Sequence, residues 1–172
     1  MLREEKQSES IILIGMPVSG KSTIGVLLAQ KLSRRFLDTD DLFQKREGLK
    51  LKEIMDSRGI EYFEKKEEAV LLSLVQRRQV IATGGSAVFY PKAMNHLKTL
   101  GSIVYLSIPF EKLEKRLWNL DTRGVVFRPG QDLRGLYEER LPLYEKYADF
   151  VIESDDSSRE NMADQIIQNL KE

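Results

Sequence analysis

The sequence has 172 residues, of which 41% are hydrophobic and 31% are charged. This composition excludes an intrinsically disordered chain, and the length predicts one domain over residues 1–172. With 27 basic and 27 acidic residues, the formal net charge is zero, which argues against a general binder of nucleic acids or membrane surfaces. The absence of cysteine excludes disulfides, thiolate metal sites and a cysteine nucleophile.

The beginning of the sequence carries no export or membrane signal. Residues 1–9 form a mostly polar and charged tail, and the apolar run that follows covers only residues 11–14. A signal peptide needs an apolar stretch of roughly 7–15 residues, and a membrane helix needs about 20. We therefore expect a cytoplasmic protein without a membrane segment.

Short apolar runs alternate with longer helical patterns along the chain. Strands are predicted at residues 11–15, 36–37, 80–83, 103–108 and 150–152, and helices at 21–33, 61–78, 110–119, 132–147 and 158–170. The stronger strands are nearly continuous in Val, Ile and Leu, as in a parallel sheet that is covered on both faces. The pattern predicts an α/β fold with a doubly wound sheet.

The segment 119–133 breaks this alternation. It holds two Gly, one Pro and two Arg, with little periodicity. A loop of this length inside a compact domain is usually functional, so we interpret it as a lid. The alternative is a tolerated surface insertion.

Residues 15–23 read GMPVSGKST and match the phosphate-binding pattern G-x-x-x-x-G-K-[ST]. Gly15 ends a buried strand, and Gly20 lets backbone N–H groups approach phosphate oxygens. The helix that follows presents its N-terminus to the anion. Lys21 supplies a cation for the β- and γ-phosphates, and the Ser22 hydroxyl is suited to Mg²⁺. The pattern identifies neither the nucleotide nor the phosphate acceptor.

Asp38 and Asp40 are one residue apart at the end of the second predicted strand. In an extended segment they point the same way, toward the crevice at the carboxyl ends of the strands. One could hold Mg²⁺, and the other could orient or deprotonate an attacking hydroxyl group. The alternative is a helix N-cap, with a helix that begins at Asp40 or Asp41.

Gly84, Gly85 and Ser86 follow the strand predicted at 80–83. Paired glycines at this place would let a substrate contact backbone N–H groups. The alternative is a plain turn.

Taken together, the motifs resemble those of the shikimate kinase family. The resemblance rests on GxxxSGKST at 15–23, LDTD at 37–40, ATGGSAV at 82–88 and RLPLY at 140–144, and it extends from Ile11 to about Leu170. It implies a P-loop kinase fold with a five-stranded parallel sheet in the order 2-3-1-4-5. It also implies transfer of the γ-phosphate of ATP to a hydroxyl group of shikimate, with Mg²⁺.

The resemblance also implies roles on the nucleotide side of the site. The residues that would bind the nucleotide are Gly15, Ser19, Gly20, Lys21, Ser22, Thr23 and Arg116. Among these, Arg116 would stack on adenine. Ser22 and Asp38 would hold the metal ion.

On the acceptor side, Asp40 would bind the acceptor and orient its nucleophilic hydroxyl group. Gly84 and Gly85 would line the acceptor site, and Arg140 would bind the acceptor's carboxylate. Arg123, in the lid, would close over the transferred phosphate, where a late-arriving cation neutralises the charge that spreads in the transition state.

Two departures from the family pattern fall in the acceptor site. Glu64 stands where the family has a second carboxylate-binding Arg, and Ser86 stands where it has a third glycine. A Glu facing a carboxylate would repel it, unless the helix is displaced and Arg58, Lys65 or Lys66 replaces the missing Arg. Ser86 would intrude on the pocket or donate a new hydrogen bond. The rest of the run EKKEE at 64–68 predicts a solvated helix face.

Three functions are therefore compared. The first is a shikimate kinase, and the second is a kinase of the same fold for another hydroxy acid, a polyol or a hydroxy amino acid. The third is a nucleotide-binding module without catalysis. Because Lys21, Asp38, Asp40, Arg123 and Arg140 are all retained, the kinases are favoured over the silent module. We expect a small-molecule substrate and a monomer, since no interface pattern stands out.

Overall fold

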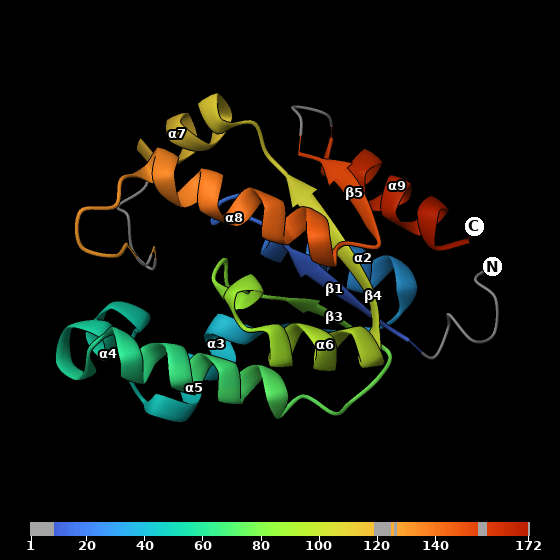
Figure 1. Cartoon of the computed structure of the whole chain (residues 1–172). Coiled ribbons are helices and arrows are strands. Elements are labelled where there is room, and N and C mark those ends of the chain that lie inside the picture. Colours follow the sequence, from blue (N-terminus) through green and yellow to red (C-terminus); the bar gives the residue numbers. More distant parts are fainter. Residues whose placement is uncertain (1–8, 119–124, 126, 155–157, 172) are drawn as a thin grey trace.

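The computed structural model describes residues 9–118, 125, 127–154 and 158–171. Its centre is a five-stranded parallel sheet in the order β2-β3-β1-β4-β5 (Figure 1). The strands are β1 (Ser10–Ile14), β2 (Arg35–Asp38), β3 (Gln79–Ala82), β4 (Gly101–Ser107) and β5 (Phe150–Glu153). The strand order implied by the family resemblance is thereby confirmed.

Helices connect consecutive strands. They are α2 (Lys21–Leu32), α3 (Thr39–Glu47), α4 (Leu51–Arg58), α5 (Ile60–Leu72), α6 (Pro91–Leu100), α7 (Phe110–Trp118), α8 (Leu133–Tyr147) and α9 (Arg159–Lys171), with a 3₁₀ turn η1 (Ala87–Phe89). None of the helices within the described residues is long and apolar enough to cross a membrane.

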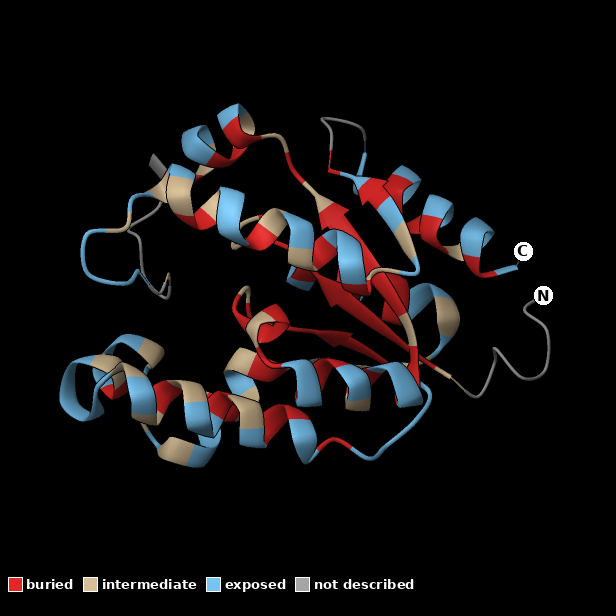
Figure 2. Cartoon of the chain, in the orientation of Figure 1, coloured by how far each residue is buried: buried red, intermediate tan, exposed pale blue. Residues whose placement is uncertain are grey.

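The three central strands, β1, β3 and β4, are buried on both faces, as their apolar runs predict. Along β1, Ile12 and Ile14 pack with α5, α6 and α8, whereas Ile11 and Leu13 pack with α2 and α9. Figure 2 shows the resulting layer of buried strands between two layers of helices. Because β1 is the middle strand, its carboxyl end opens into the centre of the molecule, where ligands bind in such sheets.

The helix predicted at 61–78 is shorter in the structure. It ends at Leu72, and Ser73 donates its hydroxyl to the carbonyl oxygen of Val70, 2.6 Å away. The chain then turns, with Arg78 at a positive φ of 62°, so that Gln79 can begin β3. The short helix α4 and the turn η1 are not predicted by the sequence patterns.

Helices α3, α4 and α5 share a small core of their own on one side of the sheet's carboxyl end. It is formed by Phe43, Ile54, Phe63 and Val70, and the rings of Phe43 and Phe63 lie 5.1 Å apart between centroids. This core fixes the beginning of α3 and one face of α5. Asp40 and Glu67 are positioned by these two elements.

Candidate functional site

The loop after β1 has the backbone that its sequence predicts. Gly15 has a φ of 147°, and a Cβ at this position would lie 2.6 Å from the carbonyl oxygen of Leu106. Gly20 has a φ of 100° and is the N-cap of α2. Glycine is thus required at Gly15 by close packing and favoured at Gly20 by its left-handed conformation. The loop directs the N-terminus of α2 into a cavity.

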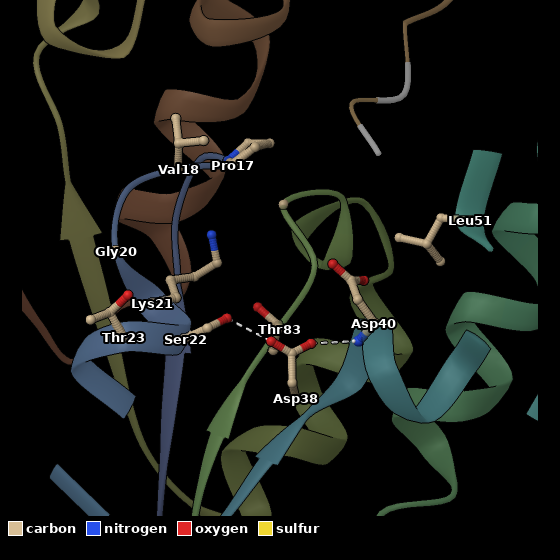
Figure 3. A pocket seen from close by; sticks show the side chains of 11 residues that line it. Pro17, Val18, Gly20, Lys21, Ser22, Thr23, Asp38, Asp40, Leu51 and Thr83 are labelled. Carbon is tan, nitrogen blue, oxygen red and sulfur yellow. Dashed lines mark hydrogen bonds between the residues drawn. The ribbon is translucent and has the colours of Figure 1, made fainter. Parts of the chain in front are cut away.

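That cavity has a volume of about 300 Å³ and lies at the carboxyl ends of the strands (Figure 3). It is lined by Pro17, Val18, Gly20, Lys21, Ser22, Thr23, Asp38, Asp40, Leu51, Thr83 and Gly85. The phosphate-binding loop and the two carboxylates predicted from the sequence therefore meet in one place. Of the predicted loop residues, Gly15 and Ser19 lie behind the cavity and support it.

Lys21 is buried in the loop. Its Nζ donates hydrogen bonds to the carbonyl oxygens of Gly15, at 2.8 Å, and Met16, at 2.7 Å. Burial lowers the pKa of Lys21 to about 8, and the nearby charge of Asp40 opposes the shift. The side chain is therefore mostly cationic at neutral pH. Its third N–H group makes only a long hydrogen bond, of 3.5 Å, to Ser19 Oγ.

Asp38 is the helix N-cap that the sequence offered as an alternative, and its second carboxylate oxygen faces Ser22. Its Oδ2 accepts a hydrogen bond from Ser22 Oγ at 2.6 Å, whereas its Oδ1 accepts from the backbone N–H groups of Asp40, at 2.9 Å, and Asp41, at 3.4 Å. Asp38 is therefore the N-cap of α3, which begins at Thr39, one residue earlier than the expected start. One carboxylate oxygen is held by the helix, and the other lies beside the Ser22 hydroxyl.

Asp40 points into the cavity from the first turn of α3, facing the loop that carries Lys21 (Figure 3). Burial raises the pKa of Asp40 to about 7, and the charges of Glu67 and Asp38 add to this effect, whereas Lys21 opposes it. A carboxylate with such a pKa can accept a proton from a hydroxyl group near neutral pH.

Gly84 and Gly85 lie against buried charged side chains, so they form more than the plain turn that the sequence offered as an alternative. A Cβ on Gly84 would lie 2.7 Å from both Asp40 Oδ1 and Glu67 Oε1. A Cβ on Gly85 would lie 2.8 Å from Arg140 Nη1. The chain thus passes close to these groups only because both residues lack a side chain.

Arg140 is 2% exposed, and no hydrogen-bond partner of its Nε is found within the described part of the chain. Its guanidinium carbon lies 5.3 Å from the centroid of the Phe89 ring. A second, narrower cavity connects it to Asp40 and is lined by Pro17, Asp40, Leu51, Phe63, Glu67, Gly84, Gly85, Ser86 and Arg140. The arrangement offers a cation at one end of this cavity and a proton acceptor at the other.

Glu64 and Ser86 both line a third cavity, which begins at Arg140. Glu64 Oε1 lies 3.8 Å from Arg128 Nη2, so its charge is partly neutralised by a residue that the sequence patterns did not single out. Arg58 and Lys66, two of the expected substitutes, instead lie over the ring of Tyr62. Ser86 does donate a new hydrogen bond, but it donates to Glu67.

Glu67 contradicts the prediction of a solvated face for residues 64–68. It is 4% exposed and accepts hydrogen bonds from Ser86 and from the Tyr90 hydroxyl at 2.6 Å. The signal was the helical spacing, because Glu67 follows Phe63 by four residues and precedes Leu71 by four, which places it on the apolar face. The carboxylate belongs to the site.

Arg116 donates through Nη1 to the carbonyl oxygen of Val18, at 3.1 Å, and to Ser154 Oγ, at 3.3 Å. Ser154 in turn donates to the carbonyl oxygen of Ser19, at 2.9 Å. Both side chains thus tie the phosphate-binding loop to the end of β5. Stacking of Arg116 on adenine stays a prediction. Arg123 lies outside the described residues, together with the rest of 119–124 and residue 126 of the expected lid. Helix α8 begins at Leu133, where the expected lid ends.

The sequence model of the shikimate kinase family matches residues 17–171. A shikimate kinase from Vibrio parahaemolyticus serotype O3:K6 is 39% identical over 170 residues, which cover 96% of this chain and 98% of that protein. One from Aliivibrio fischeri is 38% identical over 169 residues, covering 96% and 98%. The chain belongs to the shikimate kinase family.

Solved structures of this family resemble this structure over nearly the whole chain. The shikimate kinase from Acinetobacter baumannii, solved in complex with shikimate, has a TM-score of 0.86 at 33% identity and is matched over 94% of its length and 96% of this chain. The shikimate kinase from Aquifex aeolicus has a TM-score of 0.81 at 37% identity, covering 94% of this chain and 95% of that one. Membership of the family makes the chain an ATP-dependent kinase.

A gluconokinase from Sinorhizobium meliloti shares the fold, with a TM-score of 0.57 at 15% identity. This likeness concerns the fold alone.

Proposed function

We propose that this chain transfers the γ-phosphate of ATP to a hydroxyl group of shikimate. The observation that carries the proposal is the path from Lys21 through Asp40 to Arg140, along two adjoining cavities. Phosphate, hydroxyl group and carboxylate would each meet a group of suitable charge on this path. The Acinetobacter relative was solved with shikimate, which supports the choice of acceptor.

A residue is proposed for each step of the transfer. The phosphates would lie against the backbone N–H groups at the start of α2 and against Lys21. Asp40 would take the proton from the attacking hydroxyl group as its oxygen forms a bond to the γ-phosphorus. The bond from that phosphorus to the bridging oxygen of ADP breaks in the same displacement. Arg123 would close over the phosphate, and Arg116 would contact adenine.

The residues at the cavity fit a magnesium ion. Ser22 Oγ and Asp38 Oδ2 are oxygen donors 2.6 Å apart, and Mg²⁺ prefers one or two such protein ligands together with phosphate oxygens. When bound, the ion would shield the charge of the β- and γ-phosphates. Asp38 is already fixed by its cap bonds to α3, so the carboxylate is oriented before any ligand arrives.

The hydroxy amino acid remains the main alternative acceptor, because Glu64 could bind its ammonium group. The structure weakens this alternative, since Glu64 already lies beside Arg128. The monomeric state, the cytoplasmic location and the single domain remain predictions.

The test is ADP release with ATP and Mg²⁺, measured with shikimate, quinate, gluconate or homoserine and without an acceptor. We expect strong stimulation by shikimate and its loss in Asp40→Asn, with ATP binding retained. Asp41→Asn is the matched control, because Asp41 is the exposed neighbour outside the cavity. Stimulation by homoserine without a response to shikimate would overturn the proposal.

A further inference from the structure

Two guanidinium groups approach the same aromatic ring at the far end of the acceptor cavities. The guanidinium carbon of Arg140 lies 5.3 Å from the centroid of Phe89, and that of Arg128 lies 5.7 Å from it. Arg140 comes from the middle of α8, whereas Arg128 comes from the segment before that helix. Both line the third cavity, together with Glu64 and Ser86.

Arg128 is held in place without using its hydrogen-bond donors. Its Nη2 lies 3.8 Å from Glu64 Oε1, and its Nη1 lies 3.7 Å from Glu139 Oε1. These distances are ion pairs and exceed the usual hydrogen-bond range. Within the described residues, its guanidinium donates no hydrogen bond. The five N–H donors can therefore take a ligand oxygen while the charge stays between two carboxylates.

The backbone at Arg128 is anchored as well. Its N–H group donates to Gln131 Oε1 at 3.3 Å, and Gln131 Nε2 donates to Glu139 Oε2 at 2.6 Å. Glu139 precedes Arg140 on α8. The segment that carries Arg128 is thus docked on the same helix that carries the buried cation, which fixes the two arginines relative to each other.

Arg140 shows what the place can bind. Its Nε is buried and has no partner among the described residues, and leaving such a donor unsatisfied destabilises the fold. A ligand oxygen that carries negative charge would satisfy it. The same ligand, with a hydroxyl group at Asp40, would extend along the second cavity toward the third, which Arg128 lines.

Glu64 would repel such a ligand if it stood alone on the cavity wall. Its pairing with Arg128 reduces that repulsion and positions the cation at the same time. We propose that Arg128 is a specificity-determining residue that binds the acceptor's carboxylate together with Arg140, while Glu64 and Glu139 hold its guanidinium in position. The inference rests on the proposed function, because it assumes an acceptor that carries a carboxylate.

The test compares Arg128→Ala and Arg128→Lys with the wild-type enzyme. Removal of a charge-assisted contact to the carboxylate should raise the KM for shikimate about 10–100-fold, with kcat and the KM for ATP nearly unchanged. Arg128→Lys should restore part of this loss. The matched control is Arg134→Ala, since that guanidinium lies 3.9 Å from the centroid of Phe110, outside the three cavities.

The methyl ester of shikimate separates charge recognition from a structural role. With this uncharged acceptor, the KM values of wild type and Arg128→Ala should differ by less than about twofold, because neither enzyme can pair residue 128 with a carboxylate. An equal penalty for acid and ester would overturn the inference. Thermal unfolding of Arg128→Ala should match that of the wild type, since the side chain is 55% exposed.

The remaining outcomes distinguish the two proposals. If the wild type phosphorylates shikimate and Arg128→Ala leaves its KM unchanged, the inference fails and the proposed function stands. If the wild type accepts another hydroxy acid instead, the proposed function fails, and the same acid-against-ester comparison decides the role of Arg128. A wild type that accepts only uncharged acceptors overturns both.

Discussion

The hydroxyl oxygen of Ser86 lies 2.8 and 2.7 Å from the two carboxylate oxygens of Glu67. The Tyr90 hydroxyl donates to the same carboxylate. Burial raises the pKa of Glu67, whereas the hydrogen bonds from Tyr90 and Ser86 lower it. A Cβ on Gly84 would lie 2.7 Å from an oxygen of both Glu67 and Asp40, so the two carboxylates are close neighbours. The charge of Glu67 therefore raises the pKa of Asp40, the proposed base.

We therefore expect Glu67→Gln to change the pH dependence of the reaction. Asp40 works in its ionised form, so kcat/KM should fall as the pH drops through about 7. Loss of the neighbouring negative charge lowers the pKa of Asp40, and the fall should then occur at lower pH. Ser86→Ala should shift this fall in the same direction but by less. Without the hydrogen bond from Ser86, Glu67 is protonated more readily, which weakens its charge beside Asp40. Glu61→Gln, an exposed position on α5, is the control.

The measurement is kcat/KM for the acceptor from pH 5 to 9 at saturating ATP. An acidic limb that stays in place in Glu67→Gln would show that Asp40 does not control it.

Asp38 allows its two functions to be separated. Asparagine is as good an N-cap as aspartate, but it removes the anionic metal ligand. Asp38→Asn should keep the thermal stability and raise the Mg²⁺ concentration needed for half-maximal activity at least about tenfold. Asp38→Ala should show the same Mg²⁺ effect and lose a further ~1 kcal/mol of unfolding free energy. Equal Mg²⁺ dependence in Asp38→Asn and wild type would contradict the metal role.

Asp40 should make the protein less stable at alkaline pH. Its pKa is raised from 3.8 to about 7 in the fold, so the neutral carboxyl group is the form that the fold favours. The associated stability is fully present below the unfolded pKa and is lost as the pH rises to about 7. The free energy of unfolding of Asp40→Asn, relative to that of the wild type, should therefore be about 2–3 kcal/mol higher at pH 8 than at pH 5. Urea unfolding at both pH values measures this difference, and a gain independent of pH would contradict it.

Gly84→Ala tests how closely the acceptor site is packed. The new Cβ would lie 2.7 Å from carboxylate oxygens of both Asp40 and Glu67, so at least one of them must move. A displacement of about 1 Å at a reacting group can reduce the rate about 100-fold. We expect such a loss in kcat/KM for the acceptor with unchanged ATP affinity, measured by nucleotide titration. A weaker affinity for ATP would instead indicate that the phosphate-binding loop is disturbed.

The parts of the site that follow from local sequence were predictable. The turn at Gly15 and Gly20 and the carboxylates at the end of β2 are fixed by residues close together in the chain. Arg128 could not be assigned in this way, because its partners Glu64 and Glu139 lie on α5 and α8.

The fold shows the same distinction. The central strands β1, β3 and β4 were predicted because their apolar runs are buried on both faces, which leaves a strong signal in the sequence. Helix α4 was not predicted. It has eight residues and Ile54 is its one buried residue, so its sequence shows no clear helical period of apolar residues. Glu67 was misinterpreted because its charge outweighed its position on the apolar face of α5.

The bond from Ser154 to the carbonyl oxygen of Ser19 joins residues 135 positions apart. A nascent chain emerges from the ribosome with the phosphate-binding loop long before β5. Until Ser154 has left the exit tunnel, the loop lacks this hydrogen bond, and Arg116 lacks Ser154 as a partner. We therefore expect tight capture of ATP to be a late event in biosynthesis. A chain released after β4 would carry the complete motif without the side chains of Arg116 and Ser154 that support it.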